Sequence, residues 1–213
     1  MTRLIILLII AMREQMSHAQ QLIQQCTCDE LEPCKTVTIQ TVMPCADQCQ
    51  RFISSIGGNY EQIRNCFQQK SQIIDNTIKC AEDSFPNACA RRNERAKLIP
   101  RRYAKGIELA AMNEINKELR RMGIADQVTG LLTQGRRFFR CFQSCITKKL
   151  DKCGTNCGLD LPSDNTVIQT MKNCALSSGI QTTSAQDLCF CIERAGVRQL
   201  AGICPRIQIF GKK

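Results

Sequence analysis

The chain contains no tryptophan and a single histidine, His18, and its other aromatic residues are eight Phe and two Tyr among 213 residues. A large aromatic core is therefore not expected. If His18 belongs to a cleaved leader, the mature chain has no histidine. It then lacks Ser–His and Cys–His nucleophiles, histidine general bases and histidine metal ligands. No local pattern of carboxylates replaces them, so we predict no enzymatic activity and no cofactor.

Long apolar runs are also absent. The longest, Leu4 to Met12, has nine residues and follows Arg3. A membrane-spanning helix needs about 20 residues, whereas a signal peptide has a short apolar core of this kind. Small residues at Ser17 and Ala19 predict cleavage before Gln20. Residues 1–19 are thus predicted to be a signal peptide, no later segment is predicted to span a membrane, and we expect a secreted, extracellular protein.

Cysteine, by contrast, is abundant: there are sixteen, in two blocks of eight. No C-x2-C spacing occurs, which argues against zinc knuckles and redox motifs. An even number in each block predicts that each closes its own four disulfides. The predicted disulfide cysteines are Cys26, Cys28, Cys34, Cys45, Cys49, Cys66, Cys80 and Cys89 in the first block, and Cys141, Cys145, Cys153, Cys157, Cys174, Cys189, Cys191 and Cys204 in the second.

The two blocks share a register. Cys45, Cys49 and Cys66 each recur 108 positions later, as Cys153, Cys157 and Cys174. A fixed offset indicates a duplicated unit. We therefore predict one eight-cysteine helical module over 20–90, a second over 136–213, and a basic linker with an amphipathic helix over 91–135.

Helical signals dominate each module. C-x3-C places two thiols on one face of a helix, and Asn59 after the Gly57-Gly58 turn has the features of an N-cap. If the flanking helices are antiparallel, Cys49 should pair with Cys66, and Cys157 with Cys174. Only residues 35–42 alternate as a strand would. The predicted fold is all-α, with small disulfide-stapled helical modules in tandem.

Two further segments have helical periodicity. Apolar residues from Ile107 to Met122 predict an amphipathic helix that ends at Gly123. A stripe from Phe138 to Ile146, containing Cys141 and Cys145, indicates either a membrane-active basic helix or a core-facing helix held by two disulfides. We favour the second interpretation.

Positive charge is concentrated in the centre, where residues 90–140 contain 13 Lys/Arg and 5 Asp/Glu. Outside the cell such a patch would meet sulfated glycans or other polyanions, whereas the leader argues against nucleic acid. The alternatives are a solvated linker and proteolytic processing at its dibasic pairs. The candidate polyanion-binding residues are Arg91, Arg92, Arg95, Lys97, Arg101, Arg102 and Lys105.

The leader, the paired blocks and the C-x3-C-x16-C spacing resemble secreted cysteine-rich proteins of nematodes with a chondroitin proteoglycan 4-like domain. The matching stretches run from Cys45 to Cys66 and from Cys153 to Cys174. The resemblance implies an extracellular, matrix-associated or fluid-phase protein with no known catalysis. Its glycan chain is not expected here, because the only Ser-Gly dipeptide, Ser178-Gly179, lacks acidic neighbours.

We therefore predict a secreted, non-enzymatic structural or binding protein that associates with sulfated glycans. The alternatives are a basic membrane-active or host-defence protein and a carrier of small apolar ligands. The sequence predicts no oligomeric state.

Overall fold

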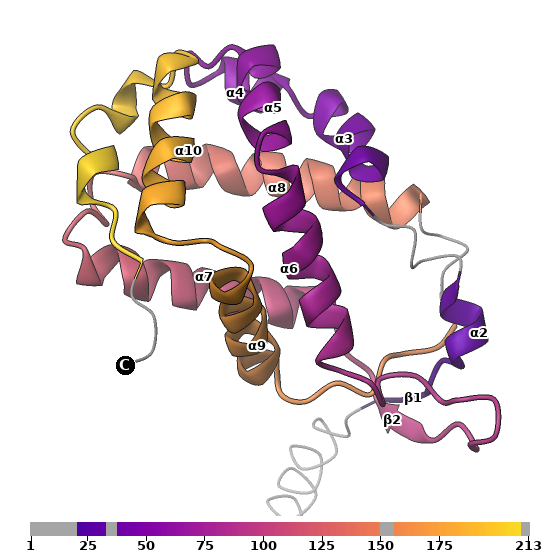
Figure 1. The fold of residues 1–213 in the computed structure, drawn as a ribbon. Coiled ribbons are helices and arrows are strands. Elements are labelled where there is room, and N and C mark those ends of the chain that lie inside the picture. Colours follow the sequence, from indigo (N-terminus) through magenta and orange to yellow (C-terminus); the bar gives the residue numbers. More distant parts are fainter. Residues whose placement is uncertain (1–20, 33–37, 150–155, 210–213) are drawn as a thin grey trace, which may run out of the picture.

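The computed structural model describes residues 21–32, 38–149 and 156–209 (Figure 1). The predicted signal peptide, Cys34 and Cys153 lie outside these residues. The described part contains nine α-helices and one two-stranded sheet, which confirms the all-α, disulfide-stapled class. None of its helices is both long and apolar enough to cross a bilayer.

The first half of the chain forms short helices and both strands of a small sheet, which lies at one end of the molecule (Figure 1). Strand β1 (Leu22–Gln24) pairs antiparallel with β2 (Leu98–Pro100). The helices that lie between these strands in sequence are α2 (Cys28–Leu31), α3 (Ile39–Gln48), α4 (Arg51–Ser54), α5 (Tyr60–Gln68) and α6 (Ser71–Asp83).

The second half is built from longer helices. These are α7 (Ala104–Arg121), α8 (Thr129–Lys149), α9 (Asp164–Ser177) and α10 (Thr182–Arg194), followed by the 3-10 turns η2 (Arg198–Leu200) and η3 (Cys204–Arg206). The amphipathic helix predicted up to Met122 is confirmed as α7. It ends at Gly123, which has a φ of 66°, a backbone conformation that glycine adopts without penalty.

The extended structure predicted for residues 35–42 is wrong from Ile39 onward, because these residues begin α3. The side chains of Ile39, Met43 and Ala46 are all buried. Their helical spacing places them on one face, which outweighs the short alternating pattern. The Asp75 carboxylate also accepts a hydrogen bond of 3.1 Å from the Ile39 backbone N–H at the start of this helix.

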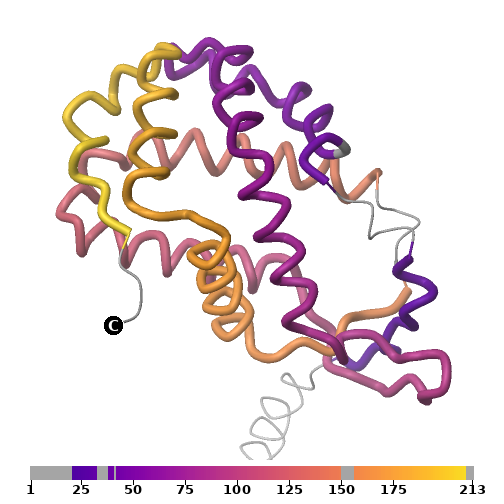
Figure 2. The backbone as a smooth tube through the Cα atoms, in the orientation of Figure 1, coloured from indigo at the N-terminus to yellow at the C-terminus, as the bar shows by residue number. Residues whose placement is uncertain are grey.

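The helices form two columns and a transverse pair. In Figure 2, α5 and α6 run beside α10 and α9, while α7 and α8 lie across these columns. Helix α5 packs on α10 and α6 packs on α9; α7 also packs on α9, and α8 packs on α3 and α4. Helices α3 and α4 thus pack mainly on α8, while Tyr60 and Arg64 of α5 contact Asp47 of α3.

The disulfides follow this packing. Both predicted pairings are wrong: Cys49 bonds Cys141, and Cys157 bonds Cys26, so neither reaches its predicted partner. Independent closure of each block is also wrong, because five of the seven described bridges join one block to the other. The seven are Cys26–Cys157, Cys28–Cys89, Cys45–Cys145, Cys49–Cys141, Cys66–Cys191, Cys80–Cys174 and Cys189–Cys204.

Two of the bridges that join the blocks involve a pair of cysteines that the offset of 108 positions makes equivalent. Cys66 of α5 bonds Cys191 of α10, whereas Cys174 of α9 bonds Cys80 of α6. The offset of 108 positions equates Cys66 with Cys174, so equivalent helices take their partners from the opposite block. The duplication itself stays a prediction, but the two blocks are covalently interlocked.

The turn before α5 docks against the end of α10. The N-cap predicted at Asn59 is confirmed, since its side chain accepts a hydrogen bond of 3.1 Å from the Gln62 backbone N–H. The Asn59 N–H donates to the Ala195 carbonyl at 2.6 Å. Gly196 has a φ of 107°, and a Cβ there would lie 2.4 Å from the Gly57 oxygen. Glycine is therefore needed where these two turns meet.

Candidate functional site

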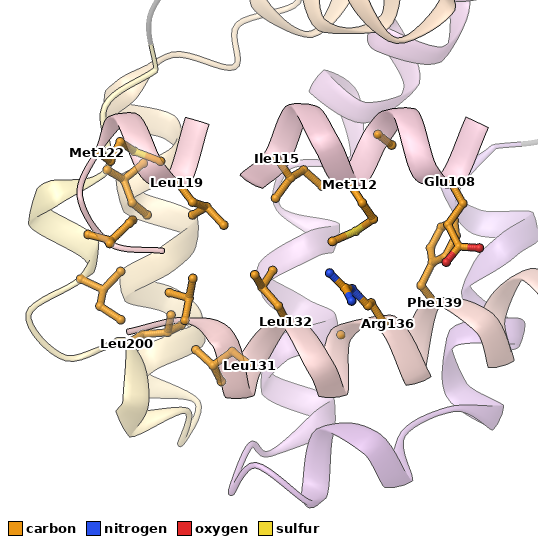
Figure 3. Close-up of a pocket in the computed structure, with 16 residues that line it drawn as sticks. Glu108, Met112, Ile115, Leu119, Met122, Leu131, Leu132, Arg136, Phe139 and Leu200 are labelled. Carbon is orange, nitrogen blue, oxygen red and sulfur yellow. The ribbon is translucent and has the colours of Figure 1, made fainter. Parts of the chain in front are cut away.

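A cavity of about 500 Å³ lies between α7 and α8 (Figure 3). Each helix contributes a stripe of residues spaced three or four positions apart, which is one helical face. The α7 side supplies Glu108, Ala111, Met112, Ile115, Leu119 and Met122, and the α8 side supplies Val128, Leu131, Leu132, Gly135, Arg136 and Phe139. All but Glu108, Gly135 and Arg136 are apolar, so the cavity suits hydrocarbon rather than polar ligands.

Separate supports hold the two walls of the cavity. Helix α7 packs on α9. Helix α8 is joined to α3 by the bridge Cys45–Cys145 and to the turn after α3 by the bridge Cys49–Cys141, which confirms the prediction of a helix held by two disulfides. Since each wall is anchored from outside, the facing apolar stripes do not need to touch in order to stay in place.

The end of the cavity near the α7–α8 turn is closed. Ile124, Val128 and Ile203 form a buried cluster there, with 1%, 6% and 4% of their surfaces exposed. The Arg206 side chain donates to the Gly123 carbonyl at 2.8 Å and so ties the C-terminal segment to this turn. The Cys189–Cys204 bridge holds the same segment to α10.

The opposite end is open and carries charge. Phe139, at this end, is 47% exposed, so apolar lining reaches solvent. The Glu108 carboxylate is neutralised by Lys105 at 3.1 Å and by Arg140 at 4.0 Å. Arg136 is exposed and makes no ion pair with any described residue. The open end therefore has a net positive charge.

A second apolar cavity, of about 400 Å³, lies between the α5–α6 column and α10. Phe67, Ile73 and Ile192 are among its lining residues. Leu200 lines this cavity as well as the first one.

The structure distributes the predicted polyanion-binding residues between two environments. Four form ion pairs: Arg92 with Asp29, Lys97 with Asp160, Arg102 with Asp164, and Lys105 with Glu108. The other three, Arg91, Arg95 and Arg101, are exposed, and their guanidinium groups form no ion pair in the described part of the chain. The Arg101 guanidinium lies 5.7 Å from the centre of the Tyr103 ring. Internal pairing thus reduces the positive charge available to a partner.

The cysteines have a structural role in every described case. The seven bridges use fourteen of them, and no described cysteine is free. A thiol engaged in a disulfide is not a metal ligand or a nucleophile. The described cysteines therefore provide a framework and no reactive group.

Tyr60 has the most strongly shifted titration among the described groups. Partial burial raises its pKa, and so do the hydrogen bond of 2.8 Å that its hydroxyl donates to Asp47 and the negative charge of that carboxylate. The same Asp47 oxygen accepts from Arg64 at 3.0 Å. This arrangement keeps the phenol protonated, and it links α3 to α5 without lining the cavity.

Sequence reasoning identified one wall of the cavity and missed the other. The α7 stripe was part of the predicted amphipathic helix, although no cavity was predicted. On α8, the sequence predicts only the stripe with Cys141 and Cys145, which is bridged to Cys49 and Cys45. The signal for the second stripe is present in the spacing of Val128, Leu131, Leu132 and Phe139.

No family model, curated protein or solved structure matches this chain.

Proposed function

We propose that this protein is a secreted, non-enzymatic binding protein that carries a small apolar molecule between α7 and α8. The observation that carries the proposal is the open cavity of about 500 Å³ with two facing apolar walls. Ligand sites commonly have about 300–1,000 Å³ and few polar groups. Filling such a space removes apolar surface from water, which contributes roughly 25 cal/mol per Å².

The disulfide framework supports this function. An apolar cavity tends to collapse when its walls can move together, because collapse also removes apolar surface from water. Here α8 is bound to α3, and the C-terminal segment is bound to α10, by bridges outside the cavity. Such a site is pre-organised, so binding costs less ordering of the protein.

The dense disulfides favour an oxidising compartment, since cytosolic thiols are kept reduced. Secretion is the part of the proposal that rests on the N-terminal sequence alone. N-terminal sequencing of protein collected from the culture medium should begin at Gln20. Protein retained in cells and starting at Met1 would contradict secretion.

The binding proposal can be tested with Nile red, an uncharged dye that fluoresces in apolar sites. Gly135 lines the cavity, and a Cβ added there meets no atom within 4 Å. Gly135→Leu should therefore place a side chain in the cavity and reduce Nile red affinity about tenfold or more, since one buried Leu side chain corresponds to about 1.5–3 kcal/mol of apolar contact.

Gly130 provides a matched control. It lies on the same helix, a Cβ there also meets no atom within 4 Å, and it does not line the cavity. Gly130→Leu should leave Nile red affinity unchanged, and both variants should keep wild-type stability or gain some, because Leu is the better helix former. Equal affinities of the two variants, or no Nile red binding by the wild type, would refute the proposal.

A second candidate function is binding of sulfated glycans. It is favoured by the three exposed arginines whose guanidinium groups form no ion pair with any described residue, Arg91, Arg95 and Arg101. Replacing these three by Gln should lower the salt concentration at which the protein leaves a heparin column. Replacing Arg92 and Arg102, which already form ion pairs, should have a smaller effect. No retention of the wild type would exclude this function.

A further inference from the structure

The charges around the α7–α8 cavity are unevenly compensated. Glu108 and Arg136 are its two charged lining residues. Glu108 already has two cationic partners, Lys105 and Arg140, whereas Arg136 has no counter-ion among the described residues. Figure 3 shows the Arg136 side chain directed between the two helices, near Met112 and Leu132. An apolar site thus has one available cation near its mouth.

Resting on the function proposed above, we propose that the ligand is a single-chain amphiphilic acid. Its carboxylate pairs with Arg136, and its hydrocarbon chain lies between the helices toward Leu200. A guanidinium matches a carboxylate through two parallel hydrogen bonds. Because Arg136 is exposed, both charges keep part of their hydration, so the desolvation penalty of a buried ion pair is largely avoided.

The length of the cavity indicates the length of the chain. The chain begins at Arg136, which lies opposite Met112 (Figure 3). Eight positions separate Arg136 from Val128 on the α8 side, and ten separate Met112 from Met122 on the α7 side. At 1.5 Å per residue these stretches are about 12 and 15 Å long. An extended chain of tetrahedral atoms advances about 1.2 Å per bond, so the space accommodates about 10 to 12 bonds, which corresponds to an acid of roughly 11 to 13 carbon atoms.

The other direction along the cavity is unsuitable for the carboxylate. The far end is formed by Ile124, Val128 and Ile203, all nearly inaccessible to water. A carboxylate there would lose its hydration without gaining a cation, which is strongly unfavourable. The charge distribution thus fixes the orientation of the ligand, with its acid group at the open end.

The test uses the delipidated mature protein and two probes of equal chain length, dodecanoate and dodecan-1-ol. Each displaces Nile red from the wild type, from Arg136→Gln and from the control Arg137→Gln. Arg137 is also exposed on α8 but does not line the cavity. We expect Arg136→Gln to weaken dodecanoate binding about tenfold and to leave dodecan-1-ol binding unchanged. Arg137→Gln should match the wild type with both probes.

The outcomes separate this inference from the proposed function. If Arg136→Gln leaves dodecanoate affinity unchanged, or if both probes bind the wild type equally, the proposal of an acid is wrong and an apolar-ligand site remains. If neither probe nor Nile red binds, both proposals fail. Sedimentation velocity provides a further outcome. If the protein is a dimer that excludes Nile red until it is diluted, a second copy of this chain occupies the cavity, and the proposal that the ligand is an acid is wrong.

Discussion

An ion triad between α7 and α9 offers a sharp test of how the cavity wall is held. The Lys172 ammonium of α9 donates hydrogen bonds to Glu114 and Glu118, one turn apart on α7, and the first of these is 2.7 Å long. The three side chains are 27%, 16% and 22% exposed. Removing Lys172 would leave two partly buried carboxylates facing each other. We therefore predict that Lys172→Met destabilises the protein.

The loss of stability caused by Lys172→Met should lie between two known limits. Exposed ion pairs contribute about 0–1 kcal/mol, whereas breaking a buried pair costs about 3–5 kcal/mol. This triad is partly buried, and Met keeps most of the packing of the Lys stem. A loss of about 1–3 kcal/mol in the free energy of unfolding is therefore expected at pH 7.

The destabilisation by Lys172→Met should depend on pH in a defined direction. The hydrogen bond from Lys172 lowers the pKa of Glu114 below its usual 4.5. Stabilisation from this carboxylate is thus complete above about pH 4.5 and is lost as the pH falls through its lowered pKa. Burial disfavours the charged form of Lys172, but its hydrogen bonds to the two carboxylates outweigh burial and raise its pKa. Its contribution is therefore present throughout the neutral range and is lost only as the pH rises through that raised value.

The measurement is guanidinium chloride unfolding without reductant, followed by circular dichroism at pH 7 and pH 3. The stability difference between the wild type and Lys172→Met should shrink at pH 3. Lys117→Met is the control, because Lys117 is 73% exposed and lies 4.0 Å from Glu114; it should change stability by less than about 0.5 kcal/mol. A difference for Lys172→Met that is the same at both pH values, or no larger than for the control, would refute the reasoning.

Three other predictions follow from the fold. Gly196→Ala should lower the free energy of unfolding, measured by thermal unfolding, by about 2 kcal/mol or more, because of its positive φ and its contact with Gly57. Gly202→Ala has a φ of 75° and no atom within 4 Å of its Cβ, so it should lower the free energy of unfolding by less. Equal losses would contradict the contact. Asn59→Ala should cost about 1 kcal/mol through loss of the N-cap, and an unchanged melting temperature would argue against the cap. Trypsin cleavage between Arg91 and Lys105 should leave two fragments that separate only after reduction, because five described bridges cross this segment; separation without reductant would disprove the connectivity.

The sequence alone determined the local features of this protein. The helical spacing before Gly123 predicted α7, and Asn59 predicted the start of α5. The stripe with Cys141 and Cys145 predicted that two disulfides hold α8. Each of these depends on residues within a few turns of one another, where helical periodicity and capping act directly.

Only the tertiary structure decided which cysteines meet and where space remains. A cysteine on a helical face has the same local pattern whether its partner lies in its own block or in the other, so spacing could not distinguish Cys66 from Cys141 as the partner of Cys49. The cavity likewise exists because α9 and α3 hold the stripes of α7 and α8 apart. Apolar stripes give the same sequence pattern whether they pack together or face a ligand, because periodicity records which face is apolar and not what covers it.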